Sequence, residues 1–206
     1  GRKVGLTDEG WLTDSWYFVT PSAALKPGQQ VRHILLGQPV VVGRTAGGEV
    51  FALRDVCPHR LVPLSAGQQV ETAGEATLQC PYHGWRYNPQ GDVDDIPYHD
   101  GPCPKSASIR SYPVVDNMGC IMAWFDPDGR APDYDAPSLA EWDDSQWVRW
   151  ELDHLGELQI HPQEILDNMA DVRHLGPTHG APSEYFENEY KDHICIQRQG
   201  GPMQLY

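Results

Sequence analysis

Two short stretches, CPHR at residues 57–60 and CPYHGW at residues 80–85, decide how this sequence is interpreted. Each stretch holds one cysteine and one histidine, separated by one residue in the first and by two in the second. A tight loop with this spacing presents a sulfur and a nitrogen ligand together. The 20 residues between His59 and Cys80 let the two loops meet at the tip of a small β domain. The sequence therefore predicts one metal site shared by Cys57, His59, Cys80 and His83.

Two kinds of metal site use two cysteines and two histidines. Structural zinc sites in zinc fingers take a pair of cysteines from one segment and a pair of histidines from the other. Here each segment contributes one of each, as an iron–sulfur cluster with two chemically different irons requires. We therefore predict a [2Fe–2S] cluster with Cys57 and Cys80 on one iron and His59 and His83 on the other.

The two segments resemble the cluster loops of the Rieske family, and more narrowly those of its oxygenase branch. Respiratory-chain Rieske proteins carry a second cysteine in each loop, and neither loop of this sequence has one. The opening Trp16-Tyr17 and the stretch from Gly119 to Phe125 also resemble the cluster domain of these oxygenases. A respiratory Rieske subunit is disfavoured for a second reason, because no apolar stretch is long enough for a membrane anchor.

The chain up to residue 125 is rich in short apolar runs that are closed by Gly, Pro, Asn or Asp, a pattern typical of β-strands. The expected strands are Trp16–Thr20, Val31–Leu36, Val40–Arg44, Val50–Val56, Thr77–Cys80 and Cys120–Phe125. Their number and spacing predict a small antiparallel β domain of the sandwich or barrel type.

The composition changes after this domain. The 3 prolines and 6 aspartates between residues 126 and 146 disfavour a strand or a helix and predict a linker or a surface wrap. A strand-like run follows from Val148 to Ile160. A helix is predicted from Pro162 to His174, with proline in its first turn, an apolar stripe along one side, and Gly176-Pro177 ending the run.

We therefore expect an α+β chain in four parts. An N-terminal extension covers residues 1–15, and a mostly antiparallel β Rieske domain covers residues 16–125. A linker over residues 126–147 leads to residues 148–206. The resemblance implies that this last part is the beginning of an α+β, helix-grip-like catalytic domain, which is not finished at Tyr206.

Residues of the predicted helix form a second candidate metal site. Asp167, Asp171 and His174 are spaced i, i+4 and i+7, which places them along one helix face. His179 follows the Gly-Pro break, where the chain can fold back toward that face. Two histidines and a carboxylate with open positions are the ligand set of non-haem Fe(II) oxygenases. A polar helix face with two histidines is also compatible with an ordinary solvated surface, so these residues alone leave both interpretations open.

Beside a Rieske motif, the pattern Asn168-x-x-Asp171-x-x-His174-x4-His179 resembles the mononuclear-iron motif of Rieske oxygenase catalytic subunits. The resemblance implies that His174 and His179 bind a mononuclear Fe(II). Asp171 would be a bridging carboxylate that hydrogen-bonds His174 and reaches a cluster-ligand histidine of a neighbouring subunit. Asn168 would lie near the iron without being a regular ligand.

The resemblance leaves the third iron ligand unassigned within this sequence. In the family an Asp or Glu from much further along the catalytic domain completes the site, and this chain ends 27 residues after His179. The local carboxylates Glu164 and Asp167 do not serve this purpose in the family pattern. We therefore expect the chain to be an N-terminal portion of a longer subunit.

The resemblance implies an enzyme, the terminal oxygenase component that uses O₂ to hydroxylate, demethylate or desaturate a small hydrophobic ring substrate. Its electrons would come from an NAD(P)H-dependent reductase, directly or through a ferredoxin, and its assembly would be a homotrimer. The stretch from Pro182 to Gln197 resembles steroid-ring hydroxylases and sterol desaturases. This sets a steroid-like substrate beside a smaller aromatic acid or methyl ether. The alternative function is a Rieske ferredoxin-type electron carrier without its own catalytic iron.

The charge balance and the cysteines limit the remaining functions. The chain has 15 Lys and Arg against 29 Asp and Glu, a formal net charge of −14, whereas nucleic-acid binding needs a basic surface. The sequence opens without a signal-peptide-like segment, and a soluble, cytoplasmic protein without a membrane span is expected. Its 5 widely spaced cysteines argue against a disulfide framework. Cys103, Cys120 and Cys195, which lie outside the motifs, are expected to be buried thiols.

Overall fold

The chain divides into two compact units, residues 2–152 and residues 153–206. The computed structural model describes residues 5, 10–72, 74–151, 156–191 and 194–202. Much of the predicted extension over residues 1–15 lies outside this described part. No helix of the described residues is long and apolar enough to cross a membrane.

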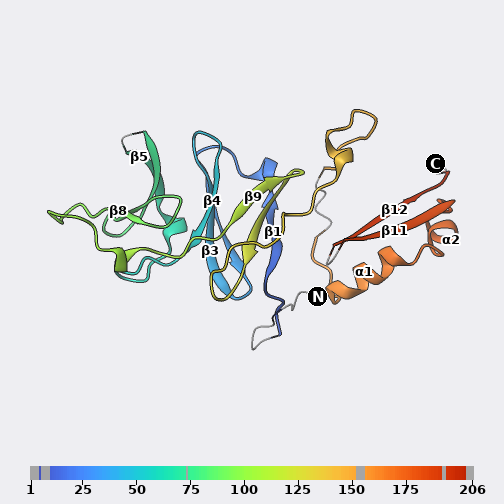
Figure 1. The fold of residues 1–206 in the computed structure, drawn as a ribbon, viewed down its shortest axis with the longest axis horizontal. Helices are drawn as coiled ribbons and strands as arrows, with labels where there is room; N and C mark the ends of the chain where they lie inside the picture. The colour runs from blue at the N-terminus through green and yellow to red at the C-terminus, as the bar shows by residue number, and fades with distance from the viewer. Residues whose placement is uncertain (1–4, 6–9, 73, 152–155, 192–193, 203–206) are drawn as a thin grey trace. The chain divides into compact units, whose positions relative to one another are not determined.

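Antiparallel strands with short connections make up the first unit (Figure 1). The strands are β1 (Ser15–Pro21), β2 (Gln30–Leu35), β3 (Gln38–Arg44), β4 (Val50–Arg54), β5 (Gln68–Thr72), β6 (Glu75–Gln79), β7 (Arg86–Tyr87), β8 (Val93–Asp95), β9 (Val114–Asn117) and β10 (Cys120–Phe125). Short 3-10 helices occur at η1 (Ser22–Ala24), η2 (Leu64–Ala66), η3 (Lys105–Ala107) and η4 (Ala140–Asp143). The sheets have the strand orders β1-β10-β9, β2-β3-β4 and β5-β6-β7-β8. This arrangement confirms the prediction of a mostly antiparallel β domain.

Each of the six strands predicted before residue 126 corresponds to an observed strand, and β10 has the predicted bounds. The sequence did not reveal β5, β7, β8 and β9. Two of these strands have only two or three residues, and β5 (QQVET) is largely polar, so none of them has a strong apolar alternation. They are held by pairing with their neighbours rather than by a pattern of their own.

The apolar run in β3 is buried on both faces of its sheet. Val41 packs with Leu53 in a core that also contains the cysteines of both predicted cluster loops. Val40 and Val42 belong to a second core, which includes residues of β1 and β10. Neighbouring side chains of a strand point to opposite faces. Three consecutive valines therefore serve two cores, and one of these cores lies beneath the cluster loops.

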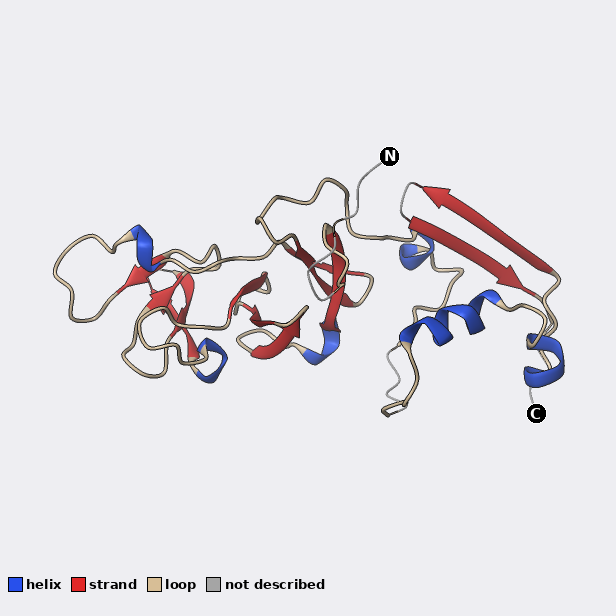
Figure 2. Ribbon diagram, turned by 90° about the horizontal axis from the view of Figure 1, so that it is seen from below, coloured by secondary structure: helices blue, strands red, loops and turns tan. Residues whose placement is uncertain are grey.

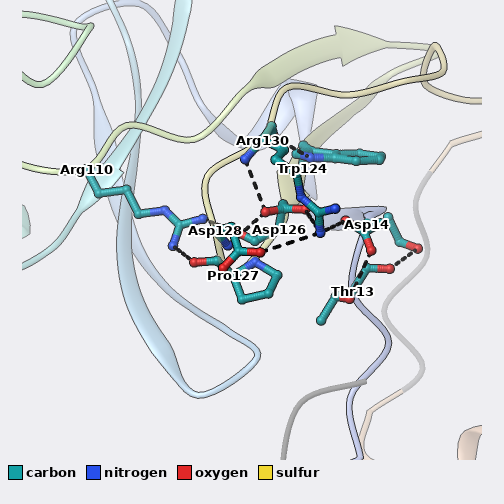
Figure 3. Close-up of polar contacts among 9 residues, drawn as sticks. Thr13, Asp14, Arg110, Trp124, Asp126, Pro127, Asp128 and Arg130 are labelled. Carbon is teal, nitrogen blue, oxygen red and sulfur yellow. Dashed lines mark hydrogen bonds and ion pairs between the residues drawn. The ribbon is translucent and has the colours of Figure 1, made fainter. Parts of the chain in front are cut away.

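The predicted linker begins with a polar turn packed on the first unit (Figure 3). Asp126 is 1% exposed, and its Oδ1 accepts hydrogen bonds from the backbone N–H groups of Asp128 and Arg130. The Arg130 guanidinium lies 2.7 Å from Asp126 Oδ2 and 3.0 Å from Asp14 Oδ1. These contacts hold the start of the segment 126–147 against the strands β1 and β10.

The second unit contains two helices and a β-hairpin (Figure 2). These elements are α1 (Pro162–Ala170), α2 (Leu175–His179), β11 (Tyr185–Lys191) and β12 (Ile194–Gly200). The N-cap residue of α1 is His161, whose Nδ1 accepts the Gln163 N–H at 3.1 Å, and proline fills the first turn. The Gln197 side-chain amide donates to the Met169 carbonyl at 3.1 Å, which ties β12 to α1.

Three predictions for this region are wrong. The described residues of the expected strand, 148–151 and 156–160, form no strand, and its other residues lie outside the described part. The helix ends at Ala170 rather than at the predicted His174. At its end the Asp171 Oδ1 accepts the Arg173 N–H at 2.9 Å, a local bond that competes with the helical one. Gly176 and Pro177 lie in the first turn of α2, where proline is well tolerated, and they do not end a helix.

The three cysteines outside the motifs also differ from expectation. Cys195 is exposed, and Cys103 and Cys120 are only partly buried. Cys195 lies on the two-stranded hairpin, where alternate side chains face outward and no further layer of the described chain covers them.

Candidate iron sites

The first predicted cluster loop is a tight turn that follows β4. The Cys57 carbonyl accepts a hydrogen bond from the Leu61 N–H at 2.8 Å, and the Cys57 N–H donates to the Val62 carbonyl at 3.0 Å. Leu61 has a φ of 58°, the left-handed conformation that closes the turn. His59 lies in the middle of this turn, so the backbone bonds fix the relation between its imidazole and the Cys57 thiol.

The second predicted loop repeats this geometry between β6 and β7. The Gly84 N–H donates to the Cys80 carbonyl at 3.1 Å, and the Cys80 N–H donates to the Trp85 carbonyl at 2.7 Å. Gly84 takes the left-handed position with a φ of 77°, where a Cβ would approach the Pro97 ring to 3.2 Å. Each cysteine is therefore the first residue of a turn whose last residue is left-handed.

The two turns bring the four predicted cluster ligands together. Cys57 and Cys80 are 1% and 3% exposed and belong to the same core. The rings of His59 and His83 are partly exposed, and their centroids are 4.7 Å apart. Both thiols thus lie on the core side of the loops, while both imidazoles lie nearer the surface.

Two observations fit a binuclear cluster between these loops. The Nδ1 atom of His83 is buried, and no hydrogen-bond partner for it is found in the described part of the chain. A buried ring nitrogen without a partner is costly unless it binds a metal. Within the described residues, no three His, Cys, Asp or Glu side chains surround a single point closely enough to hold one ion. A [2Fe–2S] cluster needs no such point, because each of its irons takes only two of the four protein ligands.

The electrostatics of the loops favour neutral side chains before iron binds. Desolvation, and then the charges of His83 and Arg60, hold the pKa of His59 below its ordinary value. A neutral imidazole is the form that binds a metal. Burial raises the pKa of the Cys80 thiol, although backbone hydrogen bonds from Tyr82 and His83 oppose this. A metal charge beside the thiol would favour the thiolate and oppose this effect of burial.

The sequence did not single out Tyr87, which lies in β7 two residues beyond the second motif. Its side chain is fully buried, and its hydroxyl lies 3.5 Å from Cys57 Sγ. Burial, followed by the contact with Cys57, raises the pKa of Tyr87 far above its ordinary range. The phenol therefore stays protonated, and its O–H can donate a hydrogen bond to the sulfur. The signal for this residue was the alternation of aromatic side chains in YHGWRY at residues 82–87.

Aromatic rings cover the two imidazoles. Trp85 stacks on His59 with the ring centroids 4.8 Å apart and the planes inclined by 6°. The Trp85 indole N–H donates to the Tyr98 hydroxyl. The Tyr82 ring lies against His83 with the centroids 3.9 Å apart. These rings limit the access of water to the histidine side of the loops.

The structure also brings the second pair of histidines together. His174 precedes α2 and His179 ends it, and the ring centroids are 5.3 Å apart with the planes inclined by 74°. His174 Nδ1 lies within hydrogen-bond distance of the Asp171 carbonyl. A carbonyl only accepts, so His174 Nδ1 is the donor of this bond. In a neutral imidazole with this proton position, the Nε2 lone pair is the one that can bind a metal.

The acidic side chains near these histidines do not complete a metal site. Asp167 Oδ1 accepts the Gln163 side-chain amide at 2.8 Å, and the helix ends before it can carry His174 on the same face. The Asp171 carboxylate is 3.7 Å from His174 Nδ1. His174 Nδ1 is therefore hydrogen-bonded to the backbone carbonyl of Asp171 rather than to its carboxylate. Asn168 is exposed. Within the described residues the structure thus brings together His174 and His179, but no third His, Cys, Asp or Glu that would complete a three-ligand site with them.

Two family models match consecutive parts of the chain. Residues 15–113 match the Rieske [2Fe-2S] domain, and residues 123–204 match the 3-ketosteroid 9alpha-hydroxylase C-terminal domain. The first match includes both cluster loops, and the second includes His174 and His179.

Relatives of the chain include a sterol desaturase and the oxygenase component of a steroid monooxygenase. The chain is 31% identical over 172 residues to cholesterol 7-desaturase of Caenorhabditis elegans, covering 81% of this chain and 38% of that protein. It is 28% identical over 184 residues to the oxygenase component of 3-ketosteroid-9-alpha-monooxygenase of Rhodococcus rhodochrous, covering 88% of this chain and 47% of that protein. Dicamba monooxygenase bound to 3,6 dichlorosalicylic acid matches in structure with a TM-score of 0.69 at 28% identity, covering 89% of this chain and 54% of that one. The chain thus spans less than half the length of cholesterol 7-desaturase and of the 3-ketosteroid-9-alpha-monooxygenase component.

The cluster loops and the family matches define an iron–sulfur protein of the Rieske class. More narrowly, the chain belongs to the Rieske oxygenases, and its second part is of the 3-ketosteroid 9alpha-hydroxylase C-terminal type. The predictions of the family, the fold class and the [2Fe–2S] cluster are confirmed. The individual ligand residues stay predictions.

Proposed function

We propose that this chain is part of the terminal oxygenase component of a Rieske non-haem iron system. Cys57, His59, Cys80 and His83 hold the [2Fe–2S] cluster, and His174 and His179 hold a mononuclear Fe(II). Bound there, the cluster supplies one-electron transfer and the ferrous ion supplies activation of O₂. The observation that carries the proposal is the pairing of imidazoles in both matched domains, with centroids 4.7 Å and 5.3 Å apart.

The residues around the cluster loops prepare them for electron transfer. With Cys57 bound as a thiolate, the Tyr87 O–H donates a hydrogen bond to its sulfur and stabilises the negative charge there. Trp85 and Tyr82 exclude water from one side of the imidazoles, while the rings of His59 and His83 remain partly exposed. An NAD(P)H-dependent reductase, directly or through a ferredoxin, delivers electrons at this exposed edge.

Asp171 positions His174 and links the two kinds of site. Its carbonyl holds the proton on His174 Nδ1, which orients the ring and leaves Nε2 for the iron. Its carboxylate is 55% exposed and can reach a cluster-ligand histidine of a neighbouring subunit in a homotrimer. Asn168 lies near the iron without binding it. The predicted division of the chain, 16–125 for the cluster and 148–206 for the beginning of the catalytic domain, corresponds to these two roles.

The substrate is a hydrophobic ring compound, and a steroid or sterol is the first class to test. The family model of residues 123–204 is named for a 3-ketosteroid 9α-hydroxylase, and the cited relatives carry names of enzymes acting on cholesterol and on 3-ketosteroids. The segment from Pro182 to Gln197, which the sequence marks as steroid-hydroxylase-like, forms the hairpin β11–β12. The likeness to dicamba monooxygenase supports a smaller aromatic substrate as the alternative.

A second candidate function is that of a Rieske ferredoxin-type electron carrier. The observation in its favour is that the described residues provide two imidazoles but no third ligand at the second site. In that case His174 and His179 are ordinary surface side chains, and the chain holds the cluster alone.

Metal analysis of the full-length subunit distinguishes the two functions. We expect about three irons and two acid-labile sulfides per chain, with a Rieske EPR signal after dithionite reduction. The same protein, supplied with a reductase, NADH and O₂, should convert a 3-ketosteroid or a sterol into a hydroxylated or desaturated product detectable by mass spectrometry. About two irons, with no change in His174→Ala and no turnover, would identify an electron carrier.

A further inference from the structure

Asp55 is a buried carboxylate at the base of the first cluster loop. The residue is 2% exposed, and its side chain is fully buried. Ser65 donates its backbone N–H to Asp55 Oδ1 at 2.6 Å and its hydroxyl to Asp55 Oδ2 at 2.7 Å. The Asp55 N–H donates to the Pro39 carbonyl in β3 at 2.9 Å. The backbone and both carboxylate oxygens of Asp55 are therefore held in place.

These bonds join the two ends of the loop that carries Cys57 and His59. Asp55 precedes Cys57 by two residues, and Ser65 lies in η2, just after the turn. The backbone bonds of Cys57 close the turn itself, whereas the Asp55–Ser65 pair closes the whole segment from 55 to 65. This pair is called the Asp55–Ser65 clamp.

The negative charge of the clamp is only partly neutralised. Arg32 on β2 is the cation paired with Asp55 in the described chain, with its Nε 3.5 Å from Asp55 Oδ2. The Arg32 side chain is 55% exposed, so water and salt screen its charge. Because two residues of chain span roughly 7 Å at most, the Cα atoms of Asp55 and Cys57 lie within about that distance of each other.

We propose that Asp55 is a positioning residue that also sets the reduction potential of the cluster, a role that rests on the proposed cluster ligands. Through Ser65 it fixes the loop that presents Cys57 and His59. Its charge disfavours the reduced cluster, because the electron from the reductase adds negative charge beside a carboxylate in a poorly solvated environment. Asp55 itself does not touch the iron.

The first test is the midpoint potential of the cluster in the full-length protein and in Asp55→Asn, followed by EPR in a redox titration. Asparagine has the same shape, and its oxygen accepts the Ser65 N–H while its NH₂ donates to the Ser65 hydroxyl. The clamp therefore survives and the charge is removed. We expect unchanged iron and sulfide content and a midpoint potential shifted to more positive values.

The matched control is Asp126→Asn. Asp126 is as well buried as Asp55, at 1% exposure, but it follows β10, and in the described part of the chain its side chain contacts Asp128 and Arg130 rather than a cluster loop. Its replacement should leave the potential unchanged. An unshifted potential in Asp55→Asn with a complete cluster overturns the proposal, and an equal shift in both variants does the same.

Replacing the counter-charge gives a test of opposite sign. Arg32→Gln removes the positive charge and leaves Asp55 uncompensated, so the potential should move to more negative values. The shift should be smaller than that of Asp55→Asn and should shrink as salt is added, because Arg32 is exposed. Shifts of the same sign in Arg32→Gln and Asp55→Asn would mean disturbed structure rather than charge, and would overturn the role in the potential.

Ser65 variants test the positioning part. Ser65→Ala removes one bond of the clamp and keeps the charge, so the EPR lines should broaden and a chelator should remove iron faster, whereas Ser65→Thr should restore both. If Asp55→Asn loses its cluster, Arg32→Gln becomes the test of the charge effect. An unchanged midpoint potential in Arg32→Gln would then overturn the role of the Asp55 charge. A wild-type protein that holds no cluster refutes the proposed function itself. An intact cluster that is insensitive to all three positions refutes only the role of Asp55.

Discussion

The two candidate iron sites differ in how completely the described chain builds them. At the cluster loops, Cys57 and Cys80 are buried in one core, and each loop is closed by backbone hydrogen bonds of its own cysteine. At the second site the two imidazoles lie near the surface beside a helix whose apolar residues are exposed. Ile165, Leu166 and Met169 of α1 are 46%, 59% and 58% exposed. Turns of a few residues can thus bring all four predicted cluster ligands together, whereas the segment beside the uncovered helix brings together two of the predicted iron ligands.

The largest effect is expected from removing a cluster thiolate. Cys80→Ala should abolish the [2Fe–2S] cluster, because one of the four proposed protein ligands is lost. Iron, sulfide and visible absorption of the purified protein measure this. Cys120→Ala, at a thiol outside both loops, should retain the full cluster. A cluster that persists in Cys80→Ala would contradict the ligand assignment.

The second site should lose less metal when it is changed. His174→Ala is expected to lower the iron content by about one per chain and to leave the Rieske EPR signal intact, because the cluster loops belong to the other compact unit. The control is His99→Ala, at an exposed histidine that bonds the Pro102 carbonyl. Equal iron in both variants would remove the main distinction between oxygenase and carrier.

Changing the proposed bridge should affect turnover but not metal content. Asp171→Ala should keep both metals and slow product formation about 10–100-fold or more, because an orienting partner of a metal-bound histidine is lost. Asp167→Ala, on the same helix but bonded to Gln163, should turn over normally. Steady-state product formation with the reductase measures both. Normal activity in Asp171→Ala would contradict the proposed bridging role of the Asp171 carboxylate. The orientation of His174 would then be assigned to the backbone carbonyl of residue 171.

The same contrast between local and distant contacts explains what the sequence could reveal. The meeting of the two Cys and His pairs could be predicted from the sequence, because each pair lies within one short turn. The strands of the first unit were predictable where the apolar runs are strong, as in β3 and β10. Tyr87 and the Asp55–Ser65 clamp were not predicted, because their contacts join residues that are ten or more positions apart.

The second unit shows the opposite case. The apolar spacing in α1 was read correctly, but its end was not, because the short bond from the Asp171 side chain to the Arg173 N–H stops the helix. The hairpin β11–β12 was missed, since its sequence alternates polar and apolar residues weakly (YFENEYK). Propensity decides little in such segments, and packing partners determine the outcome.

Stability measurements should show a smaller difference of the same kind. Arg44 is 11% exposed and binds Asp116 at 2.7 Å, the Ser22 hydroxyl at 3.0 Å and the Leu25 carbonyl at 2.7 Å. Arg44→Ala should lower the free energy of unfolding by about 2–3 kcal/mol, less than a fully buried pair because Asp116 is partly exposed. Urea unfolding followed by tryptophan fluorescence measures this, since all 7 tryptophans lie between residues 11 and 150.

The control for Arg44 is an ion pair on the surface of the same unit. Arg149 is 60% exposed, and its partner Asp143 is 85% exposed. Arg149→Ala should therefore cost at most about 1 kcal/mol. A loss as large as that of Arg44→Ala would mean that burial does not govern the strength of these contacts.

The smallest effect is expected in the pH dependence of the Asp126 turn. Burial opposes ionisation of Asp126, but hydrogen bonds from Asp14 and Arg130 outweigh it and hold the pKa at about 2, below the ordinary 3.8. At a pH above the ordinary pKa of 3.8, the ionised carboxylate thus stabilises the folded state. This contribution is lost as the pH falls toward about 2. The pKa of Asp14 is raised, chiefly by its hydrogen bond to Asp126, so Asp14 contributes with the opposite sign and reduces the net effect.

The measurement is the thermal unfolding midpoint of the wild type and of Asp126→Asn from about pH 6 downward. We expect the wild type to be more stable at the start and the difference to shrink steadily as the acid protonates Asp126. A difference that stays constant would mean that the backbone bonds from Asp128 and Arg130 hold the turn, with the charge of Asp126 making no contribution. The advantage of buried over exposed polar contacts would then rest on the contacts of Arg44 with Asp116, Ser22 and Leu25.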